Sequence, residues 1–84
     1  MVKVFLTNSA LRDLKKLPRV ISKRIFRKLE DFQENPFSSK NLKKLAGQPL
    51  YRIRVGDYRI ILELGKKEGE IYVLKISHRK NIYK

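Results

Sequence analysis

The sequence predicts one α+β domain, residues 1–84, in which a helical hairpin packs on a small antiparallel sheet. Two adjacent segments show apolar residues at helical spacing, and a proline separates them. The segments before and after this pair alternate between apolar and polar residues, as half-buried strands do. The resulting order is strand, helix, helix and then three strands, which is typical of an α+β domain. A chain of 84 residues has room for one modest core.

The amino-terminal half contains the first expected strand and both expected helices. Residues 2–6 alternate and are rich in Val and Phe, so they predict a short strand. Residues 10–17 predict a short helix that Pro18 ends, because proline disfavours the helical conformation in the residue before it. Three residues before this helix carry oxygens suited to an N-cap: Thr7, Asn8 and Ser9. Residues 19–33 predict the longer helix, with an apolar stripe along one side.

The carboxyl-terminal half predicts three strands joined as a meander. The expected strands are residues 50–55, 58–64 and 70–76. Before them, residues 35–39 predict a loop and residues 42–47 predict one helical turn. In the last strand, Leu74 and Ile76 are expected to face the helices, which places Lys75 on the other side of the sheet.

A two-residue loop, Gly56–Asp57, sets the register of the first two strands of this meander. Glycine supplies the positive φ that a type II′ hairpin turn needs at its first position. Val55 then pairs with Tyr58, and Arg54 lies directly opposite Arg59 on the other face. Like charges that lie opposite each other destabilise a sheet. We therefore interpret the arginine pair as part of a cluster that binds an anion.

The expected cluster brings basic residues from three neighbouring strands onto one face of the sheet. Its members are Arg52, Arg54, Arg59, Lys75 and Arg79. Guanidinium groups stay charged and bind phosphate oxygens in a bidentate manner, so the cluster suits a scissile phosphate and its transition state. The alternative is a solvated outer face, where strand arginines commonly lie. Glu63 is the only acidic residue expected on this face in this stretch.

The charge balance of the chain indicates a polyanionic partner. Twenty-one Lys and Arg stand against eight acidic residues, and the formal net charge is +13. This excess favours binding to nucleic acid with strong salt dependence, although an acidic protein partner fits the same field. The chain has no Cys and one His, so a disulfide, a Cys nucleophile and a zinc site are not expected. No segment is long and apolar enough for a signal peptide or a membrane span, so we expect a cytoplasmic protein.

Two side chains near the end of the sequence are candidates for proton transfer or base stacking. His78 is the only histidine, the residue type whose unperturbed pKa lies near neutrality. A single histidine is more often structural, but its place beside Arg79 strengthens the case for an acid or base. Tyr83 either packs or stacks on a base. Tyr51 and Tyr58 are expected in the core. Because no paired carboxylates and no glycine-rich phosphate loop stand out, phosphodiester chemistry is expected to run without a metal or other cofactor.

These motifs resemble those of the RelE/ParE superfamily, the toxins of type II toxin–antitoxin systems. The resemblance covers essentially the whole chain and rests on the element order and on three segments: Ala10–Leu17, Leu50–Ile61 and Ile76–Tyr83. It implies the RelE-like β-α-α-β-β-β fold and a cognate antitoxin as partner. RelE-like members are endoribonucleases that cut mRNA in the ribosomal A site, whereas ParE-like members inhibit DNA gyrase with the same scaffold.

The closing His-Arg-x-x-x-Tyr segment favours the RelE-like activity over gyrase inhibition and over an inactive, operator-binding member. RelE-like nucleases often carry Lys on the strand before the Gly56–Asp57 loop, where this chain has Arg. Arginine is too basic to accept a proton, so His78 is the first choice as the general base. The catalytic residues that the resemblance implies are Arg54, Arg59, His78, Arg79 and Tyr83. The residues that we expect to bind RNA are Arg52, Lys75 and Lys80.

Overall fold

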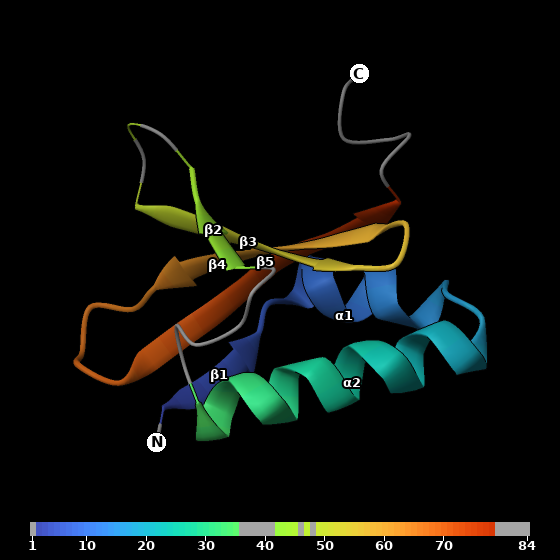
Figure 1. Cartoon of the computed structure of the whole chain (residues 1–84), viewed down its shortest axis with the longest axis horizontal. Helices are drawn as coiled ribbons and strands as arrows, with labels where there is room; N and C mark the ends of the chain where they lie inside the picture. The colour runs from blue at the N-terminus through green and yellow to red at the C-terminus, as the bar shows by residue number, and fades with distance from the viewer. Residues whose placement is uncertain (1, 36–41, 46, 48, 79–84) are drawn as a thin grey trace.

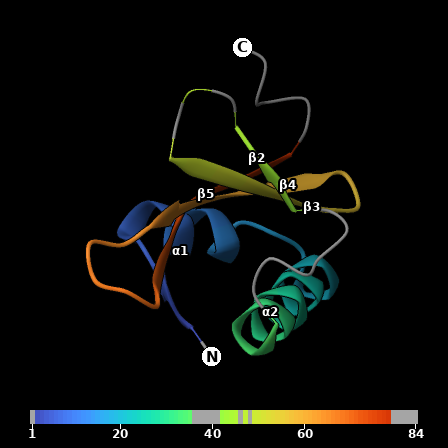
Figure 2. The ribbon, with the colours of Figure 1, turned by 60° about the vertical axis from the view of Figure 1, so that its left-hand side comes forward.

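Two helices cover one face of a five-stranded sheet, and no described helix covers the other face, which we call the open face (Figures 1 and 2). The computed structural model describes residues 2–35, 42–45, 47 and 49–78. Its elements are β1 (Lys3–Leu6), α1 (Asn8–Lys15), α2 (Arg19–Glu34), β2 (Leu42–Lys44), β3 (Leu50–Val55), β4 (Tyr58–Leu64) and β5 (Glu70–His78). The strands lie in the order β1-β5-β4-β3-β2. The predicted α+β class is therefore confirmed.

The sheet is mixed, so the prediction of a small antiparallel sheet is wrong for its edge strand β1. Strand β1 pairs in parallel with β5, from Lys3 opposite Glu70 to Leu6 opposite Val73. Hairpin loops force the strands that they join to be antiparallel. No hairpin joins β1 to β5, which lie at opposite ends of the sequence, so only the packing of the whole chain sets their relative direction.

The expected helical turn at residues 42–47 is also wrong, because residues 42–44 form strand β2. This strand pairs with β3, and Leu42 lies opposite Ile53. Leu42 and Leu45 are three residues apart, a spacing that suits one helical turn as well as it suits a short edge strand. Pairing with β3 and packing of Leu42 against the core select the strand.

The residue that precedes each helix explains where that helix begins. The Thr7 hydroxyl caps α1 by accepting a hydrogen bond from the backbone N–H of Ala10 at 3.1 Å, so α1 starts two residues before the predicted bound. Pro18 precedes α2 as its N-cap residue. The apolar stripes of both helices are buried against the sheet, at Ala10, Leu14, Ile25, Leu29 and Phe32. Tyr51 and Tyr58 pack against this core, as predicted.

A β-bulge in β5 changes which of its residues face the helices. The register with β4 shifts between Ile61, which pairs with Lys75, and Leu62, which pairs with Val73, so Leu74 has no counterpart. Val73 and Ile76 are buried, whereas Leu74 is half-buried, and the prediction that Leu74 faces the helices is wrong. The extra residue in the bulge reverses the alternation within one strand.

Helix α1 completes the hydrogen bonds of β5 where β1 ends. The Thr7 hydroxyl donates to the carbonyl of Leu74 at 3.2 Å, and the backbone N–H of Ile76 donates to Oδ2 of Asp13 at 3.0 Å. The outer edge of β1 is covered in a similar way, since the N–H of Val4 donates to Oε1 of Gln33 at 3.1 Å. Covered edges resist pairing with foreign strands. Within the described part of the chain, neither helix has the length and apolar character needed to cross a bilayer.

Candidate nucleic-acid interface

The register predicted from the Gly56–Asp57 loop is the register that the structure has. Gly56 has a φ of 59°, Val55 pairs with Tyr58, and Arg54 lies opposite Arg59. Val55 and Tyr58 pack against the core, so the two arginines project from the open face of the sheet. The two side chains therefore leave the same face of the sheet from directly opposite positions.

The two arginines differ in how firmly the sheet holds them. Arg54 is exposed, whereas Arg59 is half-buried and its Nε atom is buried. Arg59 lies between Arg54 on β3 and Ser77 on β5, and Ser77 is itself 8% exposed. Burial of the inner part of the Arg59 side chain restricts its rotamers, which favours a fixed guanidinium over a mobile one.

A second row of the open face adds further positive charge. Arg52, Ile61 and Lys75 pair across β3, β4 and β5. We call the set formed by the two rows the arginine face: Arg52, Arg54, Arg59 and Lys75. Glu63 lies on the same side of β4 but four residues from Arg59, about 13 Å along a strand. The structure thus brings together four of the predicted site residues from three strands.

His78 lies on the other side of the sheet from the arginine pair. It pairs with Tyr58, and the two rings meet edge to face with their centroids 5.1 Å apart and an angle of 87° between their planes. The alternation of β5 places His78 on the same face as the buried Ile76. Its predicted role in proton transfer remains a prediction. Arg79, Lys80 and Tyr83 lie outside the described residues, and their predicted roles are likewise untested.

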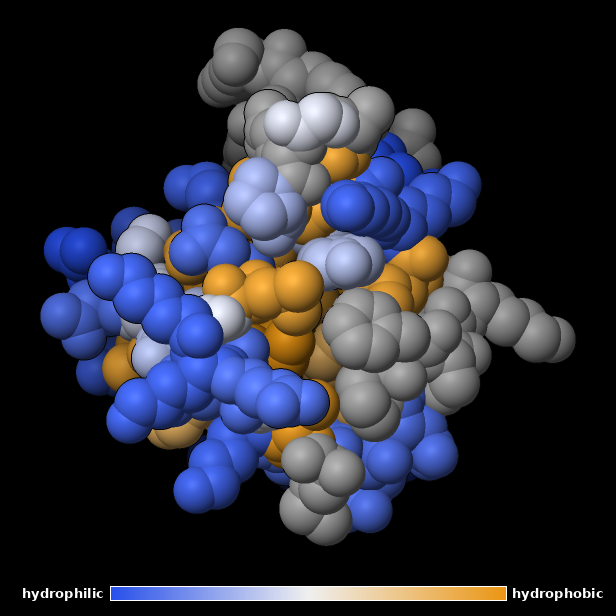
Figure 3. Space-filling model, turned by 90° about the vertical axis from the view of Figure 1, so that its left-hand side faces the viewer, coloured by the Kyte–Doolittle hydropathy of each residue, from blue (hydrophilic) through white to orange (hydrophobic). Residues whose placement is uncertain are grey.

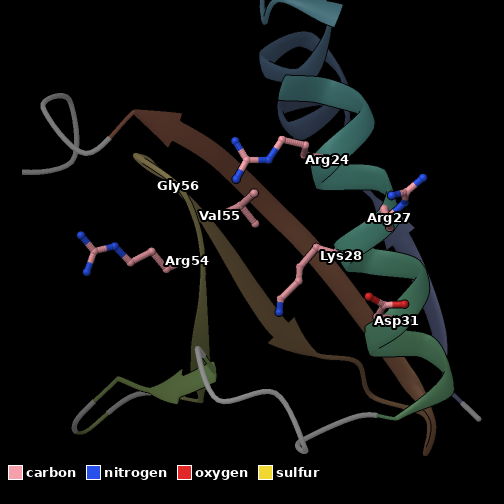
Figure 4. A pocket seen from close by; sticks show the side chains of 7 residues that line it. All are labelled: Arg24, Arg27, Lys28, Asp31, Arg54, Val55 and Gly56. Atoms are coloured by element: carbon pink, nitrogen blue, oxygen red, sulfur yellow. The ribbon is translucent and has the colours of Figure 1, made fainter. Parts of the chain in front are cut away.

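A basic hollow adjoins the arginine face at the β3–β4 turn. It has a volume of about 330 Å³, and Figure 4 shows the side chains that line it: Arg24, Arg27, Lys28, Asp31, Arg54, Val55 and Gly56. The Arg24 guanidinium reaches towards Gly56, where a Cβ atom would lie 3.7 Å from each of its terminal nitrogens (Figure 4). Lys28 points into the hollow, whereas Arg54 points away from α2 (Figure 4). Positive charge therefore continues from the arginine face around the turn to helix α2.

The residues predicted for the site from the sequence include none from α2, although α2 contributes basic side chains to this surface. Arg24, Arg27 and Lys28 follow the i, i+3, i+4 spacing that places side chains on one side of a helix. That spacing was a usable signal for a basic stripe, but only the tertiary structure brings the stripe next to the β3–β4 turn. In the described ranges, no three or more His, Cys, Asp or Glu side chains are grouped so that they could hold a metal ion.

Comparison with known proteins places these features in a family. Residues 4–83 match the family of the ParE toxin of the type II toxin–antitoxin system parDE. Toxin RelE3 of Methanocaldococcus jannaschii is 36% identical over 87 residues, which cover 98% of this chain and 96% of that protein.

Two solved structures show the same architecture. The toxin–antitoxin complex RelB-RelE from Methanococcus jannaschii contains a chain that is 36% identical, with a TM-score of 0.79 and coverage of 94% of both chains. The archaeal RelE-RelB complex from Pyrococcus horikoshii contains a chain that is 27% identical, with a TM-score of 0.81 and coverage of 95% of this chain and 97% of that chain.

Proposed function

This chain belongs to the RelE/ParE superfamily and is a RelE-like toxin of a type II toxin–antitoxin system, and we propose that it is an endoribonuclease that cleaves mRNA in the ribosomal A site. The observation that carries the proposal is the arginine face, in which Arg54 and Arg59 lie side by side against the repulsion of their charges. Guanidinium groups in this arrangement suit a phosphodiester whose negative charge grows in the transition state. We accordingly propose a cytoplasmic location, where ribosomes and mRNA are found.

The proposed reaction is attack of the RNA 2′-hydroxyl on the adjacent phosphorus, without a metal ion. A base takes the 2′ proton, the 2′ oxygen bonds to phosphorus, and the 5′ oxygen leaves as it gains a proton from an acid. Arg54 and Arg59 hold the non-bridging oxygens as their charge increases. The products are a 2′,3′-cyclic phosphate and a 5′-hydroxyl.

His78 and Tyr83 are the proposed proton carriers, with Arg79 beside them and Lys80 on the RNA backbone. Because His78 packs against Tyr58 on the helix side of the sheet, it can serve only if the scissile phosphate lies beyond the end of β5. Single-turnover assays of His78→Gln and Tyr83→Phe decide between the two, since substitution of the true proton carrier lowers the rate of the chemical step.

The test of the proposal uses programmed ribosomes. We expect the protein to cut mRNA in the A-site codon, and a 2′-deoxy substitution at the cut site to block cleavage. Arg59→Ala is expected to lower the cleavage rate about 10²- to 10³-fold. Arg12→Ala is the matched control, because it removes the same charge from an exposed site on α1. Cleavage of the deoxy substrate, or a fully active Arg59→Ala variant, would contradict the mechanism.

Inhibition of DNA gyrase is the second candidate function. The match over residues 4–83 to a family described as ParE toxin favours it. The arginine face would then contact a protein instead of RNA. A gyrase supercoiling assay run beside the ribosome assay separates the two activities, since inhibition of supercoiling without mRNA cleavage supports the ParE-like function.

The proposed protein partner is a cognate antitoxin that covers the basic surface. Two similar chains were solved as complexes of RelE with RelB, and the net charge of +13 favours a partner with acidic side chains. A pull-down with the product of the neighbouring gene tests this pairing, and loss of toxicity on co-expression is the expected result.

A further inference from the structure

A stacked pair of aromatic rings lies on the open face of the sheet, farther along the strands than the four residues of the arginine face. The rings of Phe5 and Tyr72 have centroids 5.4 Å apart and an angle of 26° between their planes. Phe5 is 40% exposed, although it belongs to a strand whose other side packs on the core. The two residues lie opposite each other in the parallel pairing of β1 with β5. The mechanism proposed above uses neither ring.

The aromatic pair belongs to the same face as the arginines. Leu50, Glu63, Tyr72 and Phe5 form one row across β3, β4, β5 and β1. Glu63 follows Arg59 by four residues on β4, so this row lies about 13 Å from the Arg54–Arg59 row. A few nucleotides of an extended single strand cover such a distance. One strand of RNA can therefore contact both rows at once.

The surroundings of Tyr72 carry the chemistry that a nucleobase requires. Tyr72 lines a hollow of about 560 Å³ together with Leu74, two lysines (Lys66 and Lys67) and two carboxylates (Glu63 and Glu70). Figure 3 faces the end of the molecule that carries the β4–β5 turn, where hydrophobic atoms are exposed between hydrophilic side chains. Aromatic and apolar groups offer a stacking surface, and the two lysines offer contacts to phosphate.

Glu63 argues for recognition of a base rather than of the backbone alone. Glu63 lies opposite Tyr72 in the pairing of β4 with β5, and it lines the same hollow. A carboxylate repels phosphate but accepts hydrogen bonds from the amino groups of bases. A single exposed Phe would need no ligand to explain it. Here two stacked rings lie beside a hollow lined by two lysines and two carboxylates, on the same side of the sheet as the arginines.

We propose that the open face holds a single strand of RNA from the arginine face to a second subsite, in which a base stacks on the Phe5–Tyr72 pair. This subsite rests on the proposed ribonuclease function, since it extends the binding of the same RNA. It positions the strand and takes no part in the chemical step.

The absence of Trp from the chain makes the subsite directly testable. Phe5→Trp creates one fluorophore at the stacking position. Phe26→Trp is the matched control, because Phe26 is 46% exposed on α2 and lines a different hollow. The probe is a short 2′-O-methyl oligoribonucleotide, which has no 2′-hydroxyl for attack, and the anisotropy of its attached dye reports binding independently. We expect saturating probe to quench the fluorescence of Phe5→Trp and to leave Phe26→Trp unchanged.

A second variant measures the contribution of stacking to affinity. Tyr72→Leu is expected to weaken binding of the oligoribonucleotide about 5- to 100-fold, the range for loss of one stacked base, and Phe26→Leu less than about 2-fold. On programmed ribosomes, Tyr72→Leu should raise KM and leave kcat unchanged, whereas Arg59→Ala should lower kcat.

The outcomes separate the subsite from the proposed function. Binding of RNA by anisotropy without quenching of Phe5→Trp overturns the subsite and leaves the ribonuclease proposal intact. Equal quenching of both Trp variants shows coating by a polyanion and also overturns the subsite. Quenching of Phe5→Trp by the antitoxin but not by RNA assigns the pair to the protein partner. Failure of the unaltered chain to cut mRNA on programmed ribosomes overturns both proposals, whereas cleavage without binding of the oligoribonucleotide overturns the subsite alone.

Discussion

Removal of Arg54 should stabilise the protein while its activity falls. Arg54 and Arg59 lie directly opposite each other, where Cβ atoms are about 5 Å apart. At a separation of about 6 Å between their charges and the dielectric constant of water, the repulsion is about 0.7 kcal/mol. Screening at physiological salt, with a Debye length of about 8 Å, reduces it to about 0.3 kcal/mol. Arg54→Ala should then raise Tm by roughly 1–2 °C for a domain of this size.

A double-mutant cycle isolates this repulsion from other effects of the substitutions. Arg59→Ala alone is ambiguous, because the Nε atom of Arg59 is buried and the variant also loses packing of the side-chain stem. The cycle of Arg54→Ala, Arg59→Ala and the double variant measures the coupling between the two residues. Arg12→Ala is the control for the reduced overall repulsion that loss of any positive charge brings to a chain of net charge +13.

The assay is thermal unfolding at low and at high salt, combined with mRNA cleavage on ribosomes. The stabilisation by Arg54→Ala should exceed that by Arg12→Ala at low salt, and the difference should vanish at about 1 M salt, where the Debye length is about 3 Å. Both Arg54→Ala and Arg59→Ala should lose cleavage activity. A destabilised Arg54→Ala variant, or an advantage that persists at high salt, would refute the repulsion. Unaltered cleavage by both variants would show that the arginine face is an ordinary solvated surface with no role in cleavage.

Three further predictions follow from the charge, the sheet edge and the β4–β5 turn. The affinity for RNA or ribosomes should fall with salt with a log–log slope of about −4 or steeper, at about 0.7–0.9 per phosphate contacted, and a filter-binding series that stays flat from low to moderate salt would contradict a nucleic-acid role for the charge. Asp13→Ala should lower the free energy of unfolding, measured in urea, by about 1.5–3 kcal/mol, because it removes the charged acceptor of the Ile76 N–H. Asp13→Asn should lower it less, and an Asp13→Ala variant as stable as the parent would show that this hydrogen bond is dispensable. Gly65→Ala places a Cβ atom 2.7 Å from Cβ of Glu70 and 2.8 Å from Cε2 of Tyr72, so it should lower the free energy of unfolding by about 1–3 kcal/mol in the same assay. A Cβ atom at Gly47 meets no atom of the described residues within 4 Å, so Gly47→Ala is the control, strained by its φ of 72°.

The features that the sequence predicted correctly are those that local chemistry decides. The opposition of Arg54 and Arg59 follows from a two-residue loop, because Gly56 admits the positive φ of a hairpin turn and the turn length leaves one register. The start of α2 after Pro18 is decided by the restricted backbone of proline. The net charge is a property of composition alone, and the polyanionic partner expected from it remains a prediction.

The features that only the tertiary structure decided depend on contacts between distant parts of the chain. The parallel pairing of β1 with β5, and with it the stacking of Phe5 on Tyr72, has no signal in either segment alone. The strand at Leu42–Lys44 and the approach of Arg24 to Gly56 likewise depend on partners far along the sequence. The bulge at Leu74 reverses the alternation of β5, and a one-residue shift moves every later side chain to the other face. Periodicity is read within a segment, whereas register and neighbours are set by the free energy of the whole packed sheet.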